Sequence, residues 1–293
     1  MKILLATDGS AHSQAAVDLL NRIPFPAGSE VTLLSVVELP PSFALGTKQQ
    51  EVIQEVRQEI QRQAEENLAQ QADCLKKAGW SVTVSLREGH VAREIISTAE
   101  DLSSELIVIG SHGRGVIGRF LLGSVSQKVA KYAPCSVLLV RKDEAANTAA
   151  TEQLKILLAY DNSVISDKAA KMVQSLPLGE NAAVDVITVM PIITYYGMDV
   201  VERMSESWQE EKHEALAALE TVAETLKQDI PNTSAKLTES VDISQEILEQ
   251  AEALNSDIIV IGQKGQSAID YFLLGSVSSR VIHHAYCSVW IVR

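Results

Sequence analysis

Aromatic residues, cysteines and long apolar runs are all scarce in this sequence, and each shortage excludes a class of protein. Aromatic residues make up 4% of the 293 residues and hydrophobic residues 46%, which is the composition of a soluble globular protein with an aliphatic core. No stretch approaches the roughly 18 consecutive apolar residues that a transmembrane helix requires. The chain is long enough for two domains of ordinary size, each with its own core.

The amino-terminal sequence MKILLATDGS begins with a lysine and a short apolar run, as a secretory signal would. The run ends at Thr7, short of the roughly 7–15 residues that the hydrophobic region of a signal peptide contains. We therefore interpret it as the first β-strand of a cytoplasmic protein.

Cysteine occurs three times, at Cys74, Cys135 and Cys287, without a C-x-x-C pair. Cys135 and Cys287 occupy equivalent places in the two halves, within CSVLLVR and CSVWIVR, where small buried side chains are usual. We expect structural thiols in a reducing compartment rather than ligands or nucleophiles.

Positive charge is also in short supply. The net charge is −13, from 25 Lys and Arg against 38 Asp and Glu. Residues 1–142 are neutral, with 15 basic and 15 acidic side chains, whereas residues 154–293 carry 10 and 20. Because nucleic acids and anionic membranes bind to basic surfaces, we expect neither as a partner.

The sequence does contain a long internal repeat. ILLATDGS at 3–10 returns as ILLAYDNS at 156–163, and the segments LLGSVS and CSV also recur in equivalent places. A period this long spans a whole domain rather than a solenoid repeat. We predict two domains, residues 1–142 and 154–293, joined by a polar, alanine-rich linker at 143–153.

Apolar runs of strand length alternate with longer helical segments in each half. Leu106–Gly110 and Ser136–Arg141 are continuously apolar, as parallel strands covered on both faces are. This alternation predicts an α/β fold of two tandem doubly wound domains, each an open five-stranded parallel sheet with helices on both faces. The other predicted strands are Lys2–Thr7, Val31–Val37, Ser81–Arg87, Lys155–Tyr160, Val184–Val189, Ala235–Ser240, Ile258–Gly262 and Val289–Arg293, and the predicted helices include Ser13–Arg22, Lys48–Lys77, Ala92–Leu102, Val125–Tyr132 and Val200–Lys227.

A glycine motif follows the fourth strand of each half, with the pattern Gly-x-x-Gly, nine residues, Gly-Ser. Such glycines let the backbone adopt positive φ and let a ligand approach closely. The residues after the last glycine are predicted to open a helix, whose first N–H groups and seryl hydroxyls would attract phosphate. The motif residues are Gly110, Gly113, Gly123, Ser124, Val125 and Ser126 in the first half, and Gly262, Gly265, Gly275, Ser276, Val277 and Ser278 in the second.

Asp8 and Asp161 follow the first strand of each half, in TDGS and YDNS. Ligands of doubly wound folds bind at the carboxyl ends of the strands, where the winding reverses. An acid there can accept hydrogen bonds from a ribose or hold a metal's water; the alternative is that both aspartates cap helices. The motif is neither a Walker loop nor a dinucleotide fingerprint.

In these motifs and in their order, both halves resemble the universal stress protein family. The resemblance implies ATP or AMP in the crevice, with any Mg²⁺ held through the phosphates, and pairing of domains through their last strands. Asp8 would then lie near the ribose and adenine, and Val36 would offer backbone groups to the base. The candidate nucleotide-binding residues are Thr7, Asp8, Val36, Gly110, Ser111, His112, Gly113, Arg114, Gly123, Ser124, Val125 and Ser126, together with Asp161, Val189, Gly262, Gly265, Gly275, Ser276, Val277 and Ser278.

The two copies of the motif differ in charge. The first includes His112, Arg114 and Arg119, whereas the second has Lys264 but no arginine, and Asp270 stands where the first has Gly118. In addition, the bulkier Tyr160 replaces Thr7 beside the crevice. We hypothesise that the N-terminal half binds ATP more tightly.

Three functions are open at this stage: a nucleotide-binding regulator of a stress response, a slow ATPase or phosphoryl-transfer enzyme, and a scaffold with a relict second site. Phosphoryl transfer needs a positioned base and usually a cationic clamp with a metal, yet no acid–base pair recurs and no histidines have metal-ligand spacing. We predict a regulator whose halves pair through Ser136–Arg141 and Val289–Arg293, since pairing satisfies two edge strands. An unknown protein partner and a homodimer are further expectations.

Overall fold

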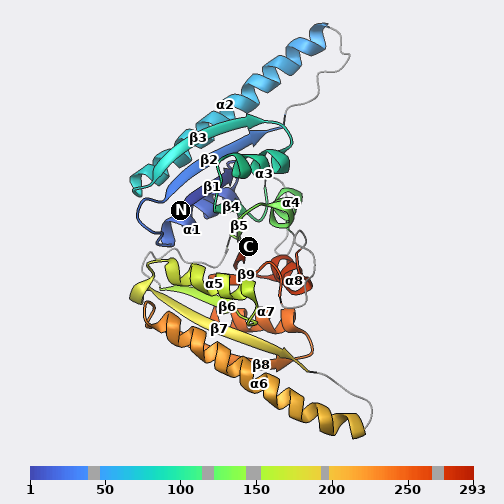
Figure 1. Cartoon of the computed structure of the whole chain (residues 1–293). Helices are drawn as coiled ribbons and strands as arrows, with labels where there is room; N and C mark the ends of the chain where they lie inside the picture. Colours follow the sequence, from blue (N-terminus) through green and yellow to red (C-terminus); the bar gives the residue numbers. More distant parts are fainter. Residues whose placement is uncertain (39–46, 114–121, 143–152, 193–197, 266–273) are drawn as a thin grey trace. The chain divides into compact units, whose positions relative to one another are not determined.

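The computed structural model describes residues 1–38, 47–113, 122–142, 153–192, 198–265 and 274–293. It divides into two compact units, Met1–Lys142 and Asp143–Arg293, each with its own sheet and helices (Figure 1). The predicted linker lies, except for Gln153, outside the described residues.

The N-terminal unit is a parallel sheet in the order β3-β2-β1-β4-β5. The chain winds outward from β1 to β3 and then returns to β4, so the winding reverses between β1 and β4. Its strands are β1 (Lys2–Thr7), β2 (Glu30–Val37), β3 (Ser81–Glu88), β4 (Leu106–Gly110) and β5 (Ser136–Val140), and its helices are α1 (Ala11–Arg22), α2 (Thr47–Lys77), α3 (Val91–Asp101) and α4 (Ser124–Tyr132).

The C-terminal unit repeats this arrangement, with the parallel order β8-β7-β6-β9-β10. The winding reverses between β6 and β9. Its strands are β6 (Leu154–Ala159), β7 (Ala182–Pro191), β8 (Thr233–Ser240), β9 (Ile258–Gly262) and β10 (Ser288–Val292), and its helices are α5 (Val164–Ser175), the 3₁₀ turn η1 (Gly179–Asn181), α6 (Met198–Lys227), α7 (Ile243–Leu254) and α8 (Ser276–His284).

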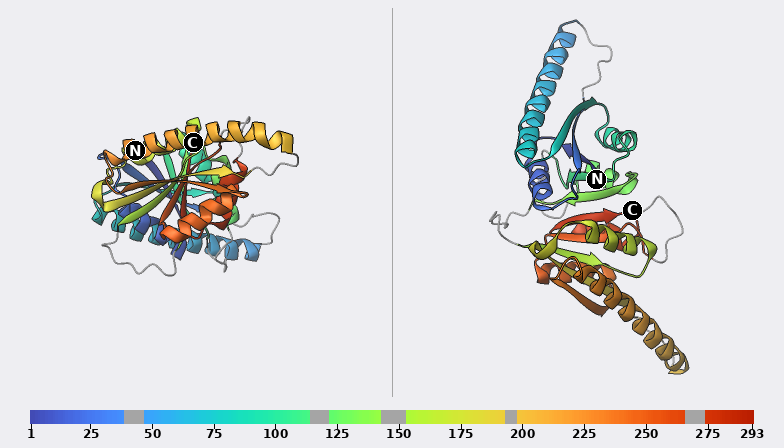
Figure 2. Two further views of the ribbon diagram at one scale, coloured as in Figure 1. Left: turned by 90° about the horizontal axis from the view of Figure 1, so that it is seen from below. Right: turned by 60° about the vertical axis from the view of Figure 1, so that its left-hand side comes forward.

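Helices cover both faces of each sheet. In the N-terminal unit α1 packs against α2, and α3 packs against α4; in the C-terminal unit α5 and α6 form one such pair and α7 and α8 the other. Figure 2 shows these helix pairs on opposite sides of the strands. All five residues of β4 and of β9 are buried, which explains their continuous apolar runs. The predicted doubly wound α/β fold is confirmed.

The long helices α2 and α6 carry the same buried stripe. Leu68, Ala72 and Leu75 of α2 have the spacing of Leu219, Ala223 and Leu226 of α6, and all six side chains are buried. This spacing places one apolar face of each helix on its sheet. When these two stripes are aligned, each position of α2 has an equivalent position in α6.

The cysteines form no disulfide: Cys287 is buried, Cys135 half-buried and Cys74 exposed. Among the described residues, no helix combines the length and the apolar character needed to cross a bilayer.

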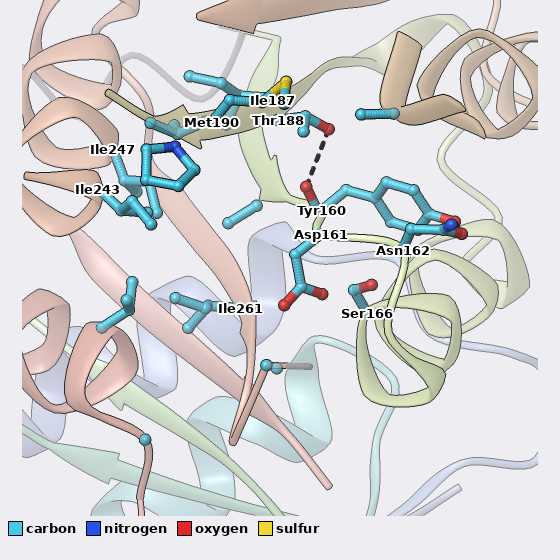
Figure 3. Close-up of a pocket in the computed structure, with 18 of the residues that line it drawn as sticks. Tyr160, Asp161, Asn162, Ser166, Ile187, Thr188, Met190, Ile243, Ile247 and Ile261 are labelled. Atoms are coloured by element: carbon cyan, nitrogen blue, oxygen red, sulfur yellow. Dashed lines mark hydrogen bonds between the residues drawn. The ribbon is translucent and has the colours of Figure 1, made fainter. Parts of the chain in front are cut away.

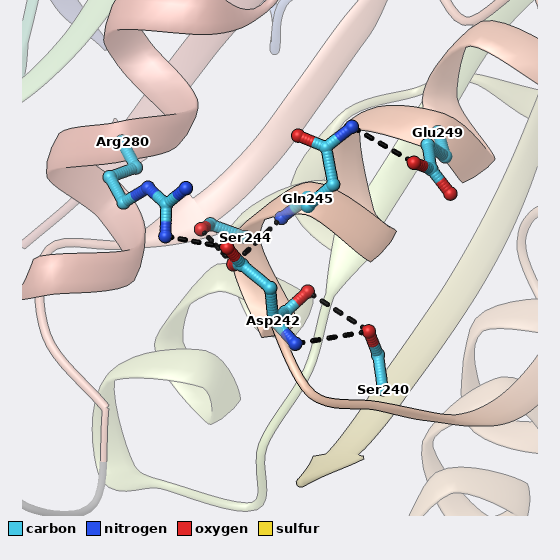
Figure 4. A network of polar contacts seen from close by, with 6 residues as sticks. All are labelled: Ser240, Asp242, Ser244, Gln245, Glu249 and Arg280. Carbon is cyan, nitrogen blue, oxygen red and sulfur yellow. Dashed lines mark hydrogen bonds and ion pairs between the residues drawn. The ribbon is translucent and has the colours of Figure 1, made fainter. Parts of the chain in front are cut away.

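A polar network joins α7 to α8 in the C-terminal unit (Figure 4). Asp242 caps α7 by accepting the Gln245 N–H at 3.2 Å and the Ser244 hydroxyl at 2.7 Å. Its other carboxylate oxygen accepts from Arg280 of α8 at 2.6 Å. The hydrogen bonds from Ser244 and Gln245, together with Arg280, lower the pKa of Asp242 from 3.8 to about 2.

This network predicts a pH-dependent stability. The ionised form of Asp242 is favoured in the folded state, so its contribution is complete above about pH 4 and is lost as the pH falls toward 2. We expect the wild type to be more stable than Asp242→Asn at neutral pH, with the difference shrinking between about pH 4 and pH 2. Urea denaturation at a series of pH values measures this.

The control variant is Glu249→Gln, which removes a carboxylate that accepts from the Gln245 side chain at 2.9 Å on the same helix. A difference between the wild type and Asp242→Asn that stays constant from neutral pH to pH 2 would contradict the assignment.

Candidate functional site

The turn after the first strand places an aspartate at the switch point of each unit. Asp8 Oδ1 accepts the Ser10 N–H at 2.9 Å, and Asp161 Oδ1 accepts the Ser163 N–H at 3.1 Å. The residue after each aspartate has positive φ, +73° at Gly9 and +59° at Asn162. Glycine and asparagine are the residues that adopt this conformation at least cost, so the two different turn sequences have the same geometry.

The helix caps in these turns are serines. Ser10 accepts the Ser13 N–H at the start of α1, and Ser163 accepts the Ser166 N–H at the start of α5, both at 3.2 Å. The alternative that Asp8 and Asp161 are capping residues is therefore wrong.

The aspartates instead lie against the second glycine of each motif. A Cβ on Gly113 would lie 2.9 Å from Asp8 Oδ2, and a Cβ on Gly265 would collide with Asp161 Oδ2. Any other residue at these glycines would have to displace the carboxylate. The turn after the first strand and the motif after the fourth therefore form a single site in each unit.

The first glycine of each motif makes room for a helix. A Cβ on Gly110 would approach the backbone carbon of His12 to 2.9 Å, and one on Gly262 would approach Ile165 Cγ2 to 2.8 Å. None of the six motif glycines has positive φ, so the expectation that they provide it is wrong. Gly110 and Gly262 allow α1 and α5 to pack closely on β4 and β9.

The loop between strand and helix is closed by hydrogen bonds at its base. In the N-terminal unit, Ser111 C=O accepts the Gly123 N–H at 2.9 Å and the Ser126 hydroxyl at 3.0 Å. In the C-terminal unit, Gln263 C=O accepts the Gly275 N–H at 2.9 Å and the Ser278 hydroxyl at 2.7 Å. The sequence predicted these serine hydroxyls as phosphate donors; they are buried and donate to backbone carbonyls instead.

The helices that follow begin without a side-chain cap. Gly123 and Gly275 are the N-cap residues of α4 and α8, and no side-chain hydrogen bond caps either helix. In α4 the first intrahelical bond runs from the Gln127 N–H to the Gly123 C=O at 2.9 Å. The N–H groups of the three preceding residues therefore lie ahead of the intrahelical ladder, where an anion is favoured by these donors and by the helix dipole.

Strand alternation directs backbone groups of Val36 and of Val189 toward the switch-point crevice of their own units. The Tyr160 N–H donates to the Ile187 C=O at 2.9 Å, so Ile187 faces β6. Since alternate residues of a strand face the same neighbour, the backbone of Val189 faces the side where β6 has already ended. Val36 is the equivalent residue of β2, one position after the Ser35–Thr7 pair.

In the C-terminal unit these residues enclose a cavity of about 630 Å³ (Figure 3). This volume lies within the range of about 300–1,000 Å³ typical of small-molecule sites. The cavity is lined by all eight C-terminal residues that the sequence singles out, Asp161, Val189, Gly262, Gly265, Gly275, Ser276, Val277 and Ser278. The structure thus brings together residues from four separate segments of the chain.

Apolar side chains form one wall of this cavity. Ile243 and Ile247 of α7 lie with Met190 and Ile261 on one side, and the Asp161 carboxylate points into the space between them and Ser166 (Figure 3). A flat apolar base can pack on the isoleucines while the carboxylate accepts hydrogen bonds from hydroxyls.

Tyr160 lines this cavity without filling it. Its hydroxyl donates to Asp167 Oδ1 at 2.8 Å and also lies 3.1 Å from Asn162 Oδ1, so its ring points away from the isoleucines (Figure 3). Burial raises the pKa of the Tyr160 phenol, and the carboxylate of Asp167 raises it further. Its replacement of Thr7 therefore does not block the crevice.

The N-terminal unit has a histidine pair where the C-terminal unit has Ile165 and Lys264. The ring of His112 is buried, lies 5.2 Å from the ring of His12 and contacts Ser111 Oγ through Nδ1 at 3.0 Å. Burial lowers the pKa of His112, and repulsion from His12 and Arg141 lowers it further. This position of the motif therefore favours neutral imidazole in the N-terminal unit, whereas the C-terminal unit has a lysine there.

Of the remaining residues that the sequence singled out, one stabilises the turn after β1 and the others lie outside the described residues. Thr7 Oγ1 accepts the Gly9 N–H at 3.2 Å within the turn after β1. Arg114, Arg119 and Asp270 fall outside the described residues.

The sequence did not identify the contribution of α6 and α7 to the site. Glu211, Glu214 and Ala215 of α6, and Ile243 and Ile247 of α7, also line the cavity. The spacing of each set places it on one helical face, but nothing in the sequence connects those faces with the glycine motif.

Comparison with known proteins agrees with this geometry. The model of the universal stress protein family matches residues 1–141 and again residues 154–293. The chain belongs to the universal stress protein family. It contains two copies of the family's domain, as the sequence predicted.

Two of the similar proteins align with the whole chain, and a third aligns with about half of it. A universal stress protein from Mycolicibacterium smegmatis is 28% identical over 99% of this chain and 96% of its own length. One from Methanocaldococcus jannaschii is 34% identical over 48% of this chain and 82% of its own length. The crystal structure of a universal stress protein from Archaeoglobus fulgidus covers 100% of this chain and 98% of its own, with a TM-score of 0.66 and 22% identity.

The packing of the motif glycines predicts unequal effects of substitution. Gly110→Ala should destabilise the N-terminal unit by about 1–3 kcal/mol, because the new Cβ meets backbone. Gly262→Ala meets the Ile165 side chain and should cost less. Urea denaturation measures both changes in unfolding free energy.

A second substitution separates the two causes. Ile165→Ala should partly restore the stability of Gly262→Ala, whereas His12→Ala should not restore Gly110→Ala, because the obstructing carbon belongs to the main chain. Restoration in both pairs would show that the close contact at Gly110 is made by a side chain.

Proposed function

We propose that this chain binds an adenine nucleotide, ATP or AMP, in the crevice of each half and acts as a nucleotide-dependent regulator. The observation that carries the proposal is the C-terminal cavity, which is lined by every residue that the sequence assigned to nucleotide binding in that half. The N-terminal unit has the same aspartate, the same glycines and the same uncapped helix start.

Each part of the nucleotide has a matching part of the cavity. The isoleucines of α7 provide an apolar surface for the base, and the backbone of Val189 provides a donor and an acceptor for its edge. The Asp161 carboxylate suits the ribose hydroxyls, and the first N–H groups of α8 suit a phosphate. Among the described residues there is no group of three or more metal-binding side chains, so we propose that any Mg²⁺ is held through the phosphates.

The cavity is better suited to binding than to phosphoryl transfer. Of its carboxylates, Asp161 holds the turn through Oδ1, and Glu211 and Glu214 are exposed on α6. Efficient transfer requires a base positioned at the attacking oxygen and a cationic clamp on the transferred group.

We also propose a regulatory role for binding. In this proposal nucleotide occupancy modulates pairing of the halves through their last strands, β5 and β10, and contacts with a protein partner.

Glycine variants test where the nucleotide binds. Gly113→Val and Gly265→Val each place a side chain against the aspartate of one half and should abolish binding there. We expect the N-terminal half to bind ATP more tightly by about 1–2 kcal/mol, the scale of one or two charge-assisted hydrogen bonds. Calorimetry on the single and double variants measures both affinities.

The matched control is Val164→Ala, an exposed position on α5 next to the capping serine and outside the cavity lining. It should bind as the wild type does. Undiminished binding of ATP and AMP to the folded double variant would refute the proposed sites, and mass spectrometry of the ligand released from freshly purified protein would identify the natural occupant.

A further inference from the structure

The wall that α6 contributes to the C-terminal cavity is acidic. Glu211 and Glu214 lie in the lining together with Asp161, and Lys264 is the one basic residue among the described lining residues. The neighbouring Lys212 does not offset them, because its ammonium group pairs with Glu239 at 2.6 Å.

The equivalent positions of the N-terminal helix α2 carry no such charge. The register that aligns Leu68 with Leu219 and Ala72 with Ala223 places Ile60 at the position of Glu211 and Gln63 at the position of Glu214. The two carboxylates are therefore a difference between the halves rather than a requirement of the fold.

The sequence of the motif loops extends this difference. Residues 114–121 include Arg114 and Arg119, whereas residues 266–273 contain Asp270 and no basic residue. Among the described residues, no three or more His, Cys, Asp or Glu side chains form a group that could hold a metal ion.

We propose that the C-terminal cavity selects adenosine and adenosine monophosphate over ATP, so that the two halves respond to different ligands. This inference rests on the proposed nucleotide binding and adds the charge that the ligand carries. A monophosphate carries about two negative charges, and each further phosphate adds roughly one more. The start of α8 can receive one phosphate, while further phosphates meet three carboxylates against the single lysine of the described lining. Repulsion between such charges is felt over about one Debye length, 8 Å.

The experiment uses the full chain with Gly113→Val, so that binding reports on the C-terminal cavity. Calorimetry with adenosine, AMP and ATP should show ATP as the weakest ligand, with the disadvantage shrinking as salt rises from about 0.05 to 0.5 M. In the same background, Glu211→Ile with Glu214→Gln copies the N-terminal wall. This double change should raise ATP affinity about three- to tenfold and change adenosine affinity by a smaller factor, because adenosine carries no charge.

The matched control is Glu210→Gln, which removes an exposed charge from the same helix outside the cavity lining and should leave the order of ligands unchanged. If ATP binds as tightly as AMP and the double change has no effect, the selection is refuted while nucleotide binding stands. If none of the three ligands binds in this background but all bind when Gly113 is restored, the C-terminal part of the proposed function is itself refuted.

Discussion

The site in each unit depends on the contact between an aspartate and a glycine. The aspartate lies in the turn after the first strand, the glycine follows the fourth strand, and they meet because the sheet places those strands side by side at the switch point. With no side chain at Gly113 or Gly265, the carboxylate can use one oxygen to close its own turn while the other lies against the loop. The aspartate carboxylate therefore provides a hydrogen-bond acceptor to a crevice beside this contact.

A second constraint leaves helix donors available. The hydroxyls of Ser126 and Ser278 donate inward to carbonyls at the end of the preceding strand, and the N-cap positions are glycines, which have no side chain to accept the first N–H groups. The buried hydroxyls hold the helix start against the strand, and the capping glycines leave its amides for another acceptor. An uncapped helix start is costly to bury without a partner, so this geometry favours an anionic ligand.

Sequence patterns predicted the strands and the motif positions, here called the skeleton, better than the side chains that line the cavity, its walls. Strands β1, β4 and β9 lie where continuous apolar runs predicted them, because parallel strands buried on both faces leave little choice of residue. The motif positions were predictable for a similar reason, since they are fixed by close backbone approach. The walls depend on the direction of individual side chains: Tyr160 turns toward Asp167, and nothing in its own sequence context indicates this. Glu211 and Glu214 lie far along the chain from the motif, and their place depends on where a long helix passes the crevice.

The difference between skeleton and walls bears on how a duplicated domain can diverge. Changes at the glycines or at the buried serines would disturb packing and binding together, because those residues hold strand, loop and helix in place. Changes on the exposed face of α6 that carries Glu211 and Glu214, here called its flank, leave the buried stripe intact. The flank and the stripe, which consists of Leu219, Ala223 and Leu226, are different faces of one helix. The flank can therefore gain charge without loss of fold. Two crevices with one backbone geometry can in this way acquire opposite preferences for the charge of a ligand, and the acidic excess of residues 154–293 acts in the same direction as the two glutamates at the cavity.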